Sequence, residues 1–230
     1  MRMLLKSWEN MPEFMKNDYV YKYYKVLTKK RVQLLIKRIF DIVLSLLCII
    51  FLSPVLVALA IWIKVDSPGP VFFRQERITQ YGKKFRIFKF RTMIVNAEQK
   101  GALVTTKSDS RITKVGKMIR HSRLDELPQL FNVLSGDMSF VGTRPEVEKY
   151  VNFYSEEMLA TLLLPAGITS LASISYRDED EVISKHISTE NSIDDIYIKI
   201  ILPDKMQYNL KYLENFSVGR DFWLCIKTVI

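Results

Sequence analysis

The sequence is poor in the residues from which several common kinds of site are built. Its 230 residues include only two cysteines and two histidines: Cys48, Cys225, His121 and His186. The cysteines offer neither a disulfide framework nor metal-ligand spacing, and we expect both to be buried thiols. The histidines are too few for a histidine-based zinc site or a serine-type triad. The glycine-rich loop ending in lysine that binds phosphate in many nucleotide hydrolases is also missing. Its absence argues against nucleotide hydrolysis by a Walker-type site.

Acidic residues are the minority among the charges. The chain has 34 Lys and Arg against 25 Asp and Glu, which gives a net charge of +9. Such a balance indicates an anionic partner: nucleic acid, an acidic lipid surface or a phosphorylated substrate. Because the basic residues are spread along the chain and no nucleic-acid-binding motif occurs, we expect no nucleic acid among the partners. The acidic run at 178–181 is most simply a solvated loop, with a magnesium site as the alternative.

One stretch has no charge at all. Ile42 to Ile63 is 22 residues long, close to the ~20 that a helix needs to cross a hydrocarbon core of roughly 30 Å. Basic residues flank it on both sides, and by the positive-inside rule we expect both flanks on the cytoplasmic side of a membrane. At its middle, Pro54 removes one helical hydrogen bond and the hydroxyl of Ser53 can take up a freed backbone group. We predict a re-entrant helix-break-helix that enters and leaves one leaflet; a kinked transmembrane helix is the alternative.

The remaining patterns predict an α+β fold that is mostly helical. Strands at 71–73 and 85–90 flank a turn at 80–82 and predict a small β-hairpin, whose phenylalanines we assign to the core rather than to a nucleobase platform. A polar loop is expected at 105–110. Periodicity and stop signals predict the other elements. These are helices at 111–121, 128–134, 147–154, 156–164, 194–201, 204–213 and 221–229, and strands at 138–141 and 168–176.

Three regions follow from these patterns. Residues 1–35 form a basic and aromatic segment that suits a membrane interface, with a poorly ordered tail as the alternative. Residues 36–66 contain the re-entrant helix. Residues 67–230 form the remaining domain, in which we see no internal repeat and no further boundary.

Two adjacent carboxylates, Asp125 and Glu126, stand just before Pro128, a residue that suits the first turn of a helix. We therefore expect both acids at a helix N-terminus, where unpaired amides and the helix dipole favour negative charge and also a bound phosphate. An ordinary helix start with surface charges is the alternative for the acid pair alone. Guanidinium groups that can pair two phosphate oxygens at once lie close in sequence. They are Arg120, Arg123 and Arg144.

The order of motifs from residue 35 onward resembles that of the bacterial sugar transferases that are monotopic phosphoglycosyl transferases. The shared motifs are the hydrophobic segment broken by Ser53-Pro54, GPVFFRQER at 69–77, KFRTM at 89–93, LDELPQ at 124–129 and GDMSFVG at 136–142. The chain departs from the family at Thr143, where the family commonly has proline before Arg-Pro, and at Ser170, where it has glycine. The second departure bears on sugar and nucleotide preference more than on chemistry.

This resemblance implies a monotopic enzyme of the inner membrane whose catalytic domain faces the cytoplasm. Such an enzyme moves a phosphosugar from a nucleotide diphosphate sugar, here expected to be a UDP-sugar, to a polyprenyl phosphate such as undecaprenyl phosphate, and so initiates surface glycan (exopolysaccharide) biosynthesis. The implied partners are the nucleotide sugar, the polyprenyl phosphate, membrane lipids and a second copy in a homodimer.

The resemblance also assigns roles to residues. Asp125 would be the nucleophile that forms a covalent phosphosugar intermediate. Glu126 would handle a proton or, with Asp125, hold the Mg²⁺ that the family uses. The phosphate-binding candidates are Arg91, Arg120, Arg123 and Arg144.

Functions other than phosphosugar transfer would also explain parts of the sequence. A membrane-anchored basic module that binds acidic lipid or nucleic acid would also explain the charge and the aromatic residues, and it would show steep salt dependence. A structural membrane scaffold needs no acid pair. A glycosidase is disfavoured because carboxylates that are neighbours in sequence seldom face each other across a sugar.

Overall fold

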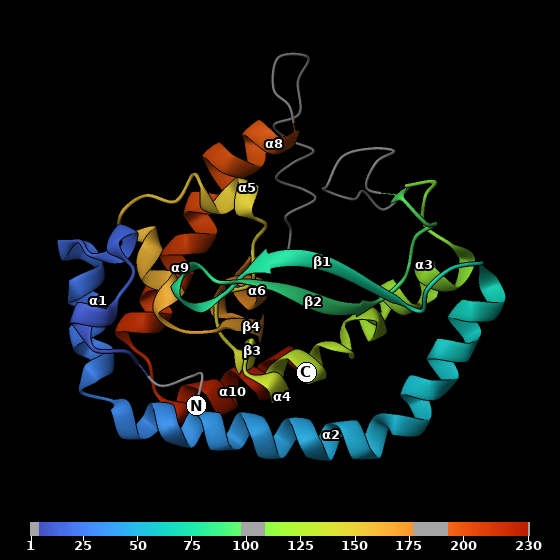
Figure 1. Cartoon of the computed structure of the whole chain (residues 1–230), viewed down its shortest axis with the longest axis horizontal. Coiled ribbons are helices and arrows are strands. Elements are labelled where there is room, and N and C mark those ends of the chain that lie inside the picture. Colours follow the sequence, from blue (N-terminus) through green and yellow to red (C-terminus); the bar gives the residue numbers. More distant parts are fainter. Residues whose placement is uncertain (1–4, 98–108, 177–192, 230) are drawn as a thin grey trace.

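The structure is a computed structural model that describes residues 5–97, 109–176 and 193–229. The predictions for the acidic run 178–181, for His186 and for most of the loop 105–110 lie outside these ranges. Figure 1 shows one long helix, α2 (Arg31–Asp66), that runs along one edge of the molecule, with the remaining helices and the strands gathered on one side of it. The described part of the chain is mostly helical, as predicted.

The hydrophobic segment lies within α2, which carries Pro54 in its interior. Figure 1 shows that α2 changes direction along its length, and proline is the usual cause of such a bend. The missing N–H of Pro54 frees the carbonyl of Ile50, and Ser53 Oγ donates to that carbonyl at 2.8 Å. The predicted repair by serine is therefore confirmed. The predicted break is a bend within one continuous helix and not an interruption of it.

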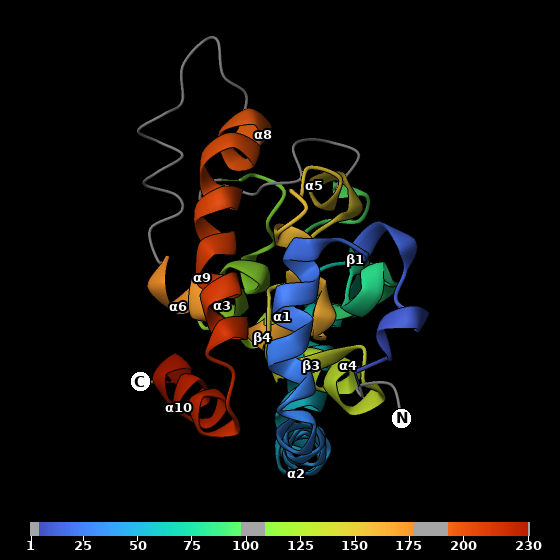
Figure 2. The same cartoon turned by 90° about the vertical axis from the view of Figure 1, so that its left-hand side faces the viewer.

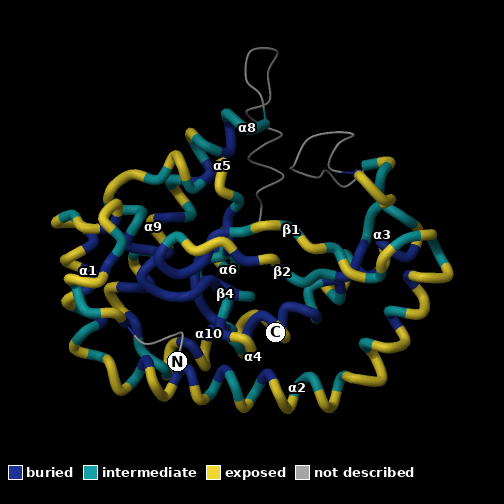
Figure 3. Tube along the Cα trace, viewed as in Figure 1, coloured by how far each residue is buried: buried dark blue, intermediate teal, exposed yellow. Residues whose placement is uncertain are grey.

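Most of α2 is not a core helix. Its most hydrophobic stretch has a mean hydropathy of 2.9, and only 11% of that stretch is buried. The exposed parts of α2 are visible along its outer side in Figure 3. By length and composition, α2 could therefore cross a membrane.

Charged side chains fix the first half of α2 to the domain above it. Lys37 Nζ donates to Asp221 Oδ2 at 2.6 Å and to the carbonyl of Val141 at 2.8 Å. Arg38 donates to the carbonyls of Val133 and Leu134, at the end of α4 (Gln129–Ser135). Both basic side chains are buried, so these bonds hold the helix firmly to the domain.

The predicted hairpin is confirmed. Strands β1 (Phe72–Ile78) and β2 (Lys84–Phe90) are antiparallel, with Phe72 opposite Phe90 and Ile78 opposite Lys84. The turn at Gln80–Gly82 places Gly82 at φ +73°, a conformation that glycine adopts without strain. One face of the hairpin, which includes Phe85 and Ile87, packs against the end of α4 and the second sheet.

The second sheet has two parallel strands, β3 (Met138–Val141) and β4 (Ala166–Thr169). The prediction of β3 is confirmed. The predicted strand at 168–176 is wrong, because β4 ends at Thr169 and a helix, α6 (Leu171–Ser175), follows. Ser170 caps that helix, since its side chain accepts a hydrogen bond from the N–H of Ser173 at 2.8 Å.

The described N-terminal residues, from Leu5 onward, pack into the core instead of forming a loose tail. Tyr23, Tyr24 and Leu27 of α1 (Asp18–Thr28) are buried in the largest core cluster, together with Leu163 and Phe216. Figure 2 shows α1 in front of the strands and beside α9. Exposed aromatic residues, among them Phe14 and Tyr19, remain on the outer side.

Among the other predicted helices, α9 and α10 are longer than predicted and the rest are shorter or divided. The two free cysteines are half-buried, not buried as predicted. The elements are the 3₁₀ turns Trp8–Asn10 and Glu13–Met15, α3 (Lys114–His121), α5 (Glu148–Val151), the 3₁₀ helix Met158–Leu163, α8 (Ile193–Ile196), the π-helix Tyr197–Ile201, α9 (Leu202–Glu214) and α10 (Val218–Val229).

Candidate active site

The acid pair lies in a tight connection between two helices. After α3 the chain passes through Arg123, whose φ of 53° is left-handed, and then through a 3₁₀ turn, Leu124–Glu126. Pro128 is the N-cap of α4. The acids therefore occupy the turn before the helix, and the prediction that they lie at its N-terminus is wrong by about one turn. The left-handed residue is the cause, because it ends α3 and starts a separate turn.

Asp125 is buried, with 9% of its surface exposed, and it faces a pocket. Burial raises the pKa of its carboxyl, because a low-dielectric environment disfavours the charged form, while the positive charges of Lys89 and Arg120 act in the opposite direction. Asp125 is thus a desolvated carboxyl group on which burial and the neighbouring cations have opposite effects.

Glu126 is held by two basic side chains. Lys89 Nζ donates to its Oε1 at 2.8 Å and Arg144 Nη2 donates to the same oxygen at 2.7 Å. Burial opposes ionisation of Glu126, but Arg144 and Lys89 outweigh that effect and hold its pKa well below the ordinary value. Burial also lowers the pKa of Lys89, against the pull of Glu126. Glu126 is thus a fixed anion between two cations.

The pocket beside Asp125 has a volume of about 370 Å³, within the range of ligand sites. Strands β1 and β2, the segment after β2 and the end of α3 form its walls. Among the described lining residues Asp125 is the single acid, and the basic residues outnumber it. They are Arg74, Arg77, Lys89, Arg91, Arg111 and Arg120. Such a lining favours an anionic ligand, with Asp125 as the one negative group that could react with it.

The predicted arginines have different surroundings. Arg120 lines the pocket, and Arg144 reaches Glu126 from the loop after β3. Arg123 is exposed, on the left-handed residue before the acids. Arg91 also lines the pocket, and its guanidinium donates to the carbonyls of Ser67 and Pro68 at the end of α2. The structure therefore brings Arg120 and Arg144 to the acids, while Arg91 ties the turn after α2 to the hairpin.

The motif analysis did not select Arg74, Arg77 and Arg111 of the pocket lining, and it also missed Lys89. Lys89 alternates with Phe85 and Ile87, so it shares the inward face of β2. A lysine at an inward position of a strand is the signal that could have identified it, because an inward charge needs a buried partner. Glu126 is that partner.

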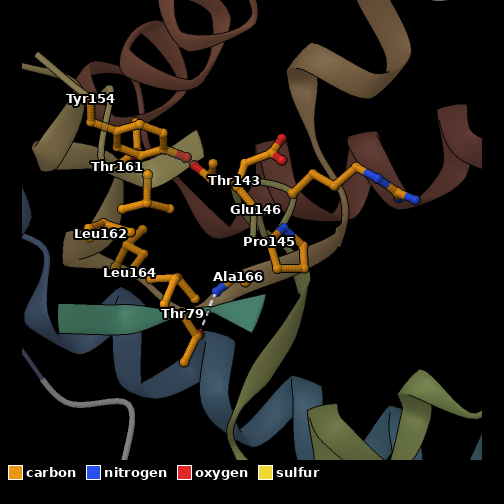
Figure 4. A pocket seen from close by; sticks show the side chains of 12 residues that line it. Thr79, Thr143, Pro145, Glu146, Tyr154, Thr161, Leu162, Leu164 and Ala166 are labelled. Carbon is orange, nitrogen blue, oxygen red and sulfur yellow. Dashed lines mark hydrogen bonds between the residues drawn. The ribbon is translucent and has the colours of Figure 1, made fainter. Parts of the chain in front are cut away.

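A second cavity, shown in Figure 4, lies beneath the loop that carries Arg144. Its volume is about 10 Å³, enough for one water molecule but not for a substrate. The buried side chain of Glu146 accepts a hydrogen bond from Tyr197 at 2.5 Å, and Arg77 donates to the carbonyl of Pro145 at 3.3 Å. This region anchors the loop and so positions Arg144.

The acid pair alone is a small ligand set for a metal ion. Within residues 5–97, 109–176 and 193–229, no group of three His, Cys, Asp or Glu could hold one. Oε1 of Glu126 is already bonded to Lys89 and Arg144. Magnesium is commonly bound by one or two carboxylates together with substrate phosphates and water. Asp125 fits that pattern, because it faces the pocket in which phosphates would lie.

Comparison with known proteins agrees with this geometry. The family model described as bacterial sugar transferase matches residues 32–230. An Aeromonas hydrophila UDP-N-acetylgalactosamine-undecaprenyl-phosphate N-acetylgalactosaminephosphotransferase is 38% identical over 197 residues, 84% of this chain and 43% of the relative. A Klebsiella pneumoniae UDP-glucose:undecaprenyl-phosphate glucose-1-phosphate transferase is 37% identical over 203 residues, 86% of this chain and 40% of the relative.

A shorter relative extends the comparison. The putative undecaprenyl-phosphate N-acetylgalactosaminyl 1-phosphate transferase of Bacillus subtilis is 42% identical over 125 residues, which are 54% of this chain and 70% of the relative. This chain spans about two fifths of the length of the Aeromonas and Klebsiella relatives. Because the family model matches nearly all of the chain, the chain belongs to the bacterial sugar transferase family.

Proposed function

We propose that this protein is a phosphoglycosyl transferase, which moves a sugar 1-phosphate from a UDP-sugar to undecaprenyl phosphate and so begins the assembly of a surface glycan. The observation that carries the proposal is the buried carboxylate of Asp125 in a pocket lined by six basic side chains. A module that only bound acidic lipid or nucleic acid would not need a desolvated acid at the centre of its basic surface. The names of the relatives supply the class of donor and acceptor.

In the first half reaction, a carboxylate oxygen of Asp125 attacks the phosphorus next to the sugar. A P–O bond forms to Asp125, the P–O bond to the nucleotide breaks, and uridine monophosphate leaves with the electron pair. Arg120, on the pocket wall, is placed to neutralise phosphate charge as it moves to the leaving group. The enzyme then carries an acyl phosphosugar.

In the second half reaction, a phosphate oxygen of the polyprenyl phosphate attacks the same phosphorus. The bond to Asp125 breaks, its carboxylate is regenerated, and the polyprenyl diphosphate sugar forms. No proton needs to be transferred in either displacement when the phosphates are ionised. The low pKa of Glu126 makes it a weak base, so we assign it the task of holding Lys89 and Arg144 in position.

Magnesium belongs to the same proposal. Asp125 and the oxygens of the bound diphosphate would hold Mg²⁺, which would supply positive charge that offsets the phosphate charge as the nucleotide leaves. Lys89 and Arg144 remain bonded to Glu126 and keep that acid away from the metal.

The membrane arrangement also belongs to the proposal. α2 enters and leaves the cytoplasmic leaflet of the inner membrane, and the pocket faces the cytoplasm. Two features support this. Basic residues flank the hydrophobic segment on both sides. Both ends of α2 also contact one domain: Lys37 bonds to Asp221 near the start, and Ile63 packs against Phe90 near the end.

The test is to trap the intermediate. Purified protein is incubated with a panel of UDP-sugars and Mg²⁺ but no acceptor, and we expect about one uridine monophosphate per enzyme and a sugar-phosphate mass increase on the peptide that contains Asp125. Asp125→Asn should show neither, with an unchanged or higher Tm, because the amide carries no charge to desolvate. Asp204→Asn, at an exposed helix start, is the matched control and should behave as wild type. Turnover by a folded Asp125→Asn protein would contradict the assignment.

A further inference from the structure

Three phenylalanine rings form a chain along the face of the hairpin opposite to Phe85 and Ile87. Phe72 and Phe88 have ring centroids 6.0 Å apart, and Phe88 and Phe131 of α4 are also 6.0 Å apart. Phe72 is 40% exposed and Phe131 is 38% exposed. We call Phe72, Phe88 and Phe131 the aromatic strip. The opposite face, with Phe85 and Ile87, packs into one core cluster. On the face of the strip, Phe90 packs into another, but Phe72 and Phe131 keep more than a third of their surface exposed, and packing of the core does not explain that exposed part.

The strip connects the pocket to the surface of α2. Phe72 lines the pocket together with Asp125, and it stacks on Phe90 with centroids 5.6 Å apart. Phe90 in turn packs against Leu59 and Ile63 of α2. Other apolar side chains of this half of α2 are exposed. They are Val55, Val57, Ile61 and Trp62. Apolar side chains therefore link this half of α2 to the edge of the pocket, through the buried Leu59, Ile63 and Phe90.

A basic group lies beside the strip. The guanidinium of Arg74 is 3.7 Å from the centroid of the Phe88 ring, and Arg74 also lines the pocket. A ligand that followed the strip from Phe131 would thus meet apolar rings, then Arg74 beside Phe88, and then the other basic side chains of the pocket that Phe72 lines. An isoprenoid chain that ends in a phosphate has this order of chemistry.

From this arrangement we propose that the aromatic strip binds the isoprenyl units nearest the phosphate of the lipid acceptor and guides that phosphate past Arg74 to the phosphosugar on Asp125. The inference rests on the proposed function. The uracil ring of the donor is a worse occupant, because the rings are tilted against each other by 83° and 60° and offer no flat platform. Arg74 also covers one face of Phe88.

The strip should act in the second half reaction. Phe131 lies outside the pocket lining, so Phe131→Ser is the most selective change. We expect KM for undecaprenyl phosphate in detergent micelles to rise about tenfold, since a buried aromatic contact of this size contributes about that factor to affinity. Isotope exchange between uridine monophosphate and the UDP-sugar, measured without acceptor, should stay near wild type. Phe131→Leu, which keeps an apolar side chain, should recover part of the loss.

Controls separate the other outcomes. Phe153→Ser removes an exposed ring elsewhere on the surface, 56% exposed against 38% for Phe131, and should leave KM for the acceptor unchanged. If Phe131→Ser instead raises KM for the UDP-sugar, the strip is a nucleobase site and the inference is wrong. If it weakens binding to acceptor-free vesicles without changing acceptor KM in micelles, the strip is a bilayer contact, and the inference is again wrong. Absence of exchange in the wild type would overturn the proposed function itself, which is a different result.

Discussion

At the scale of single residues, two adjacent carboxyl groups have opposite electrostatics. Burial raises the pKa of Asp125, while Lys89 and Arg144 hold the pKa of Glu126 low against burial. The direction of the side chain decides this difference: one acid faces the pocket and the other faces two cations. Two neighbouring acids whose pKa values are shifted in opposite directions can have different roles, and this difference supports the proposed roles of Asp125 as the nucleophile and Glu126 as a fixed anion.

Glu126→Gln should therefore lower stability in a pH-dependent way. The folded-state pKa of Glu126 lies below its ordinary value of 4.5, so its ionised form stabilises the fold above that pH, and the contribution is lost as the pH falls toward the folded-state value. At pH 7 we expect a loss of about 2 kcal/mol, typical of a charge-assisted hydrogen bond. Tm measured from pH 7 to pH 3 should show the gap to wild type narrowing below about pH 4.5.

Glu156→Gln is the matched control, because Glu156 is exposed. Its Tm should follow that of wild type at every pH. A Glu126→Gln protein whose Tm deficit grew at low pH would show that Glu126 is not the low-pKa group.

At the scale of elements, Arg91 joins the end of α2 to the hairpin that forms the pocket wall. Its guanidinium donates to the carbonyls of Ser67 and Pro68, and its backbone N–H donates to the carbonyl of Val71 at 2.9 Å. Gly69 lies directly beneath, at φ +124°, where an added Cβ would approach the Arg91 guanidinium to 2.5 Å. The turn is therefore built around this arginine.

Arg91→Lys should loosen this junction, because an ammonium cannot reproduce a planar fork that bonds two carbonyls. We expect a loss of roughly 1–2 kcal/mol in the free energy of unfolding, together with lower activity. Arg86→Lys makes the same change at an exposed position of the same strand and should have little effect. Chemical denaturation of both variants provides the comparison. Equal stabilities would mean that the two carbonyl bonds of Arg91 contribute nothing.

Local patterns predicted the elements better than the contacts between them. The alternation of residues along the hairpin and the bend at Pro54 follow from neighbours in sequence, and both were predicted. The cap at Ser170 was missed because the apolar and small residues that follow it suggested a strand, although serine is also a common N-cap of a helix. The Lys89–Glu126 bond spans 37 positions, so no local pattern could reveal it.

At the scale of the whole molecule, the attachment of both ends of α2 to one domain restricts how the protein can sit in a membrane. If α2 crossed the bilayer, its ends would lie on opposite sides, and either the bond between Lys37 and Asp221 or the packing of Ile63 on Phe90 would have to break. A helix that enters and leaves one leaflet keeps both.

Single cysteines at Lys29 and Lys83 should report this arrangement. Both positions are exposed, one before α2 and one in the hairpin turn. In a background without Cys48 and Cys225, we expect neither cysteine to react with an impermeant thiol reagent in intact cells and both to react after lysis. Labelling of only one of them in intact cells would indicate a true crossing.

The fixed attachment of α2 has a consequence for kinetics. In the proposed membrane arrangement, a helix that cannot tilt independently of its domain would hold the pocket at a constant height above the leaflet. A lipid acceptor would then reach Asp125 by lateral diffusion and need not leave the membrane. The rate of the second half reaction then depends on the number of acceptor molecules per unit of membrane area. Diluting the vesicles in more buffer would leave that rate unchanged, while diluting the acceptor with other lipids would lower it.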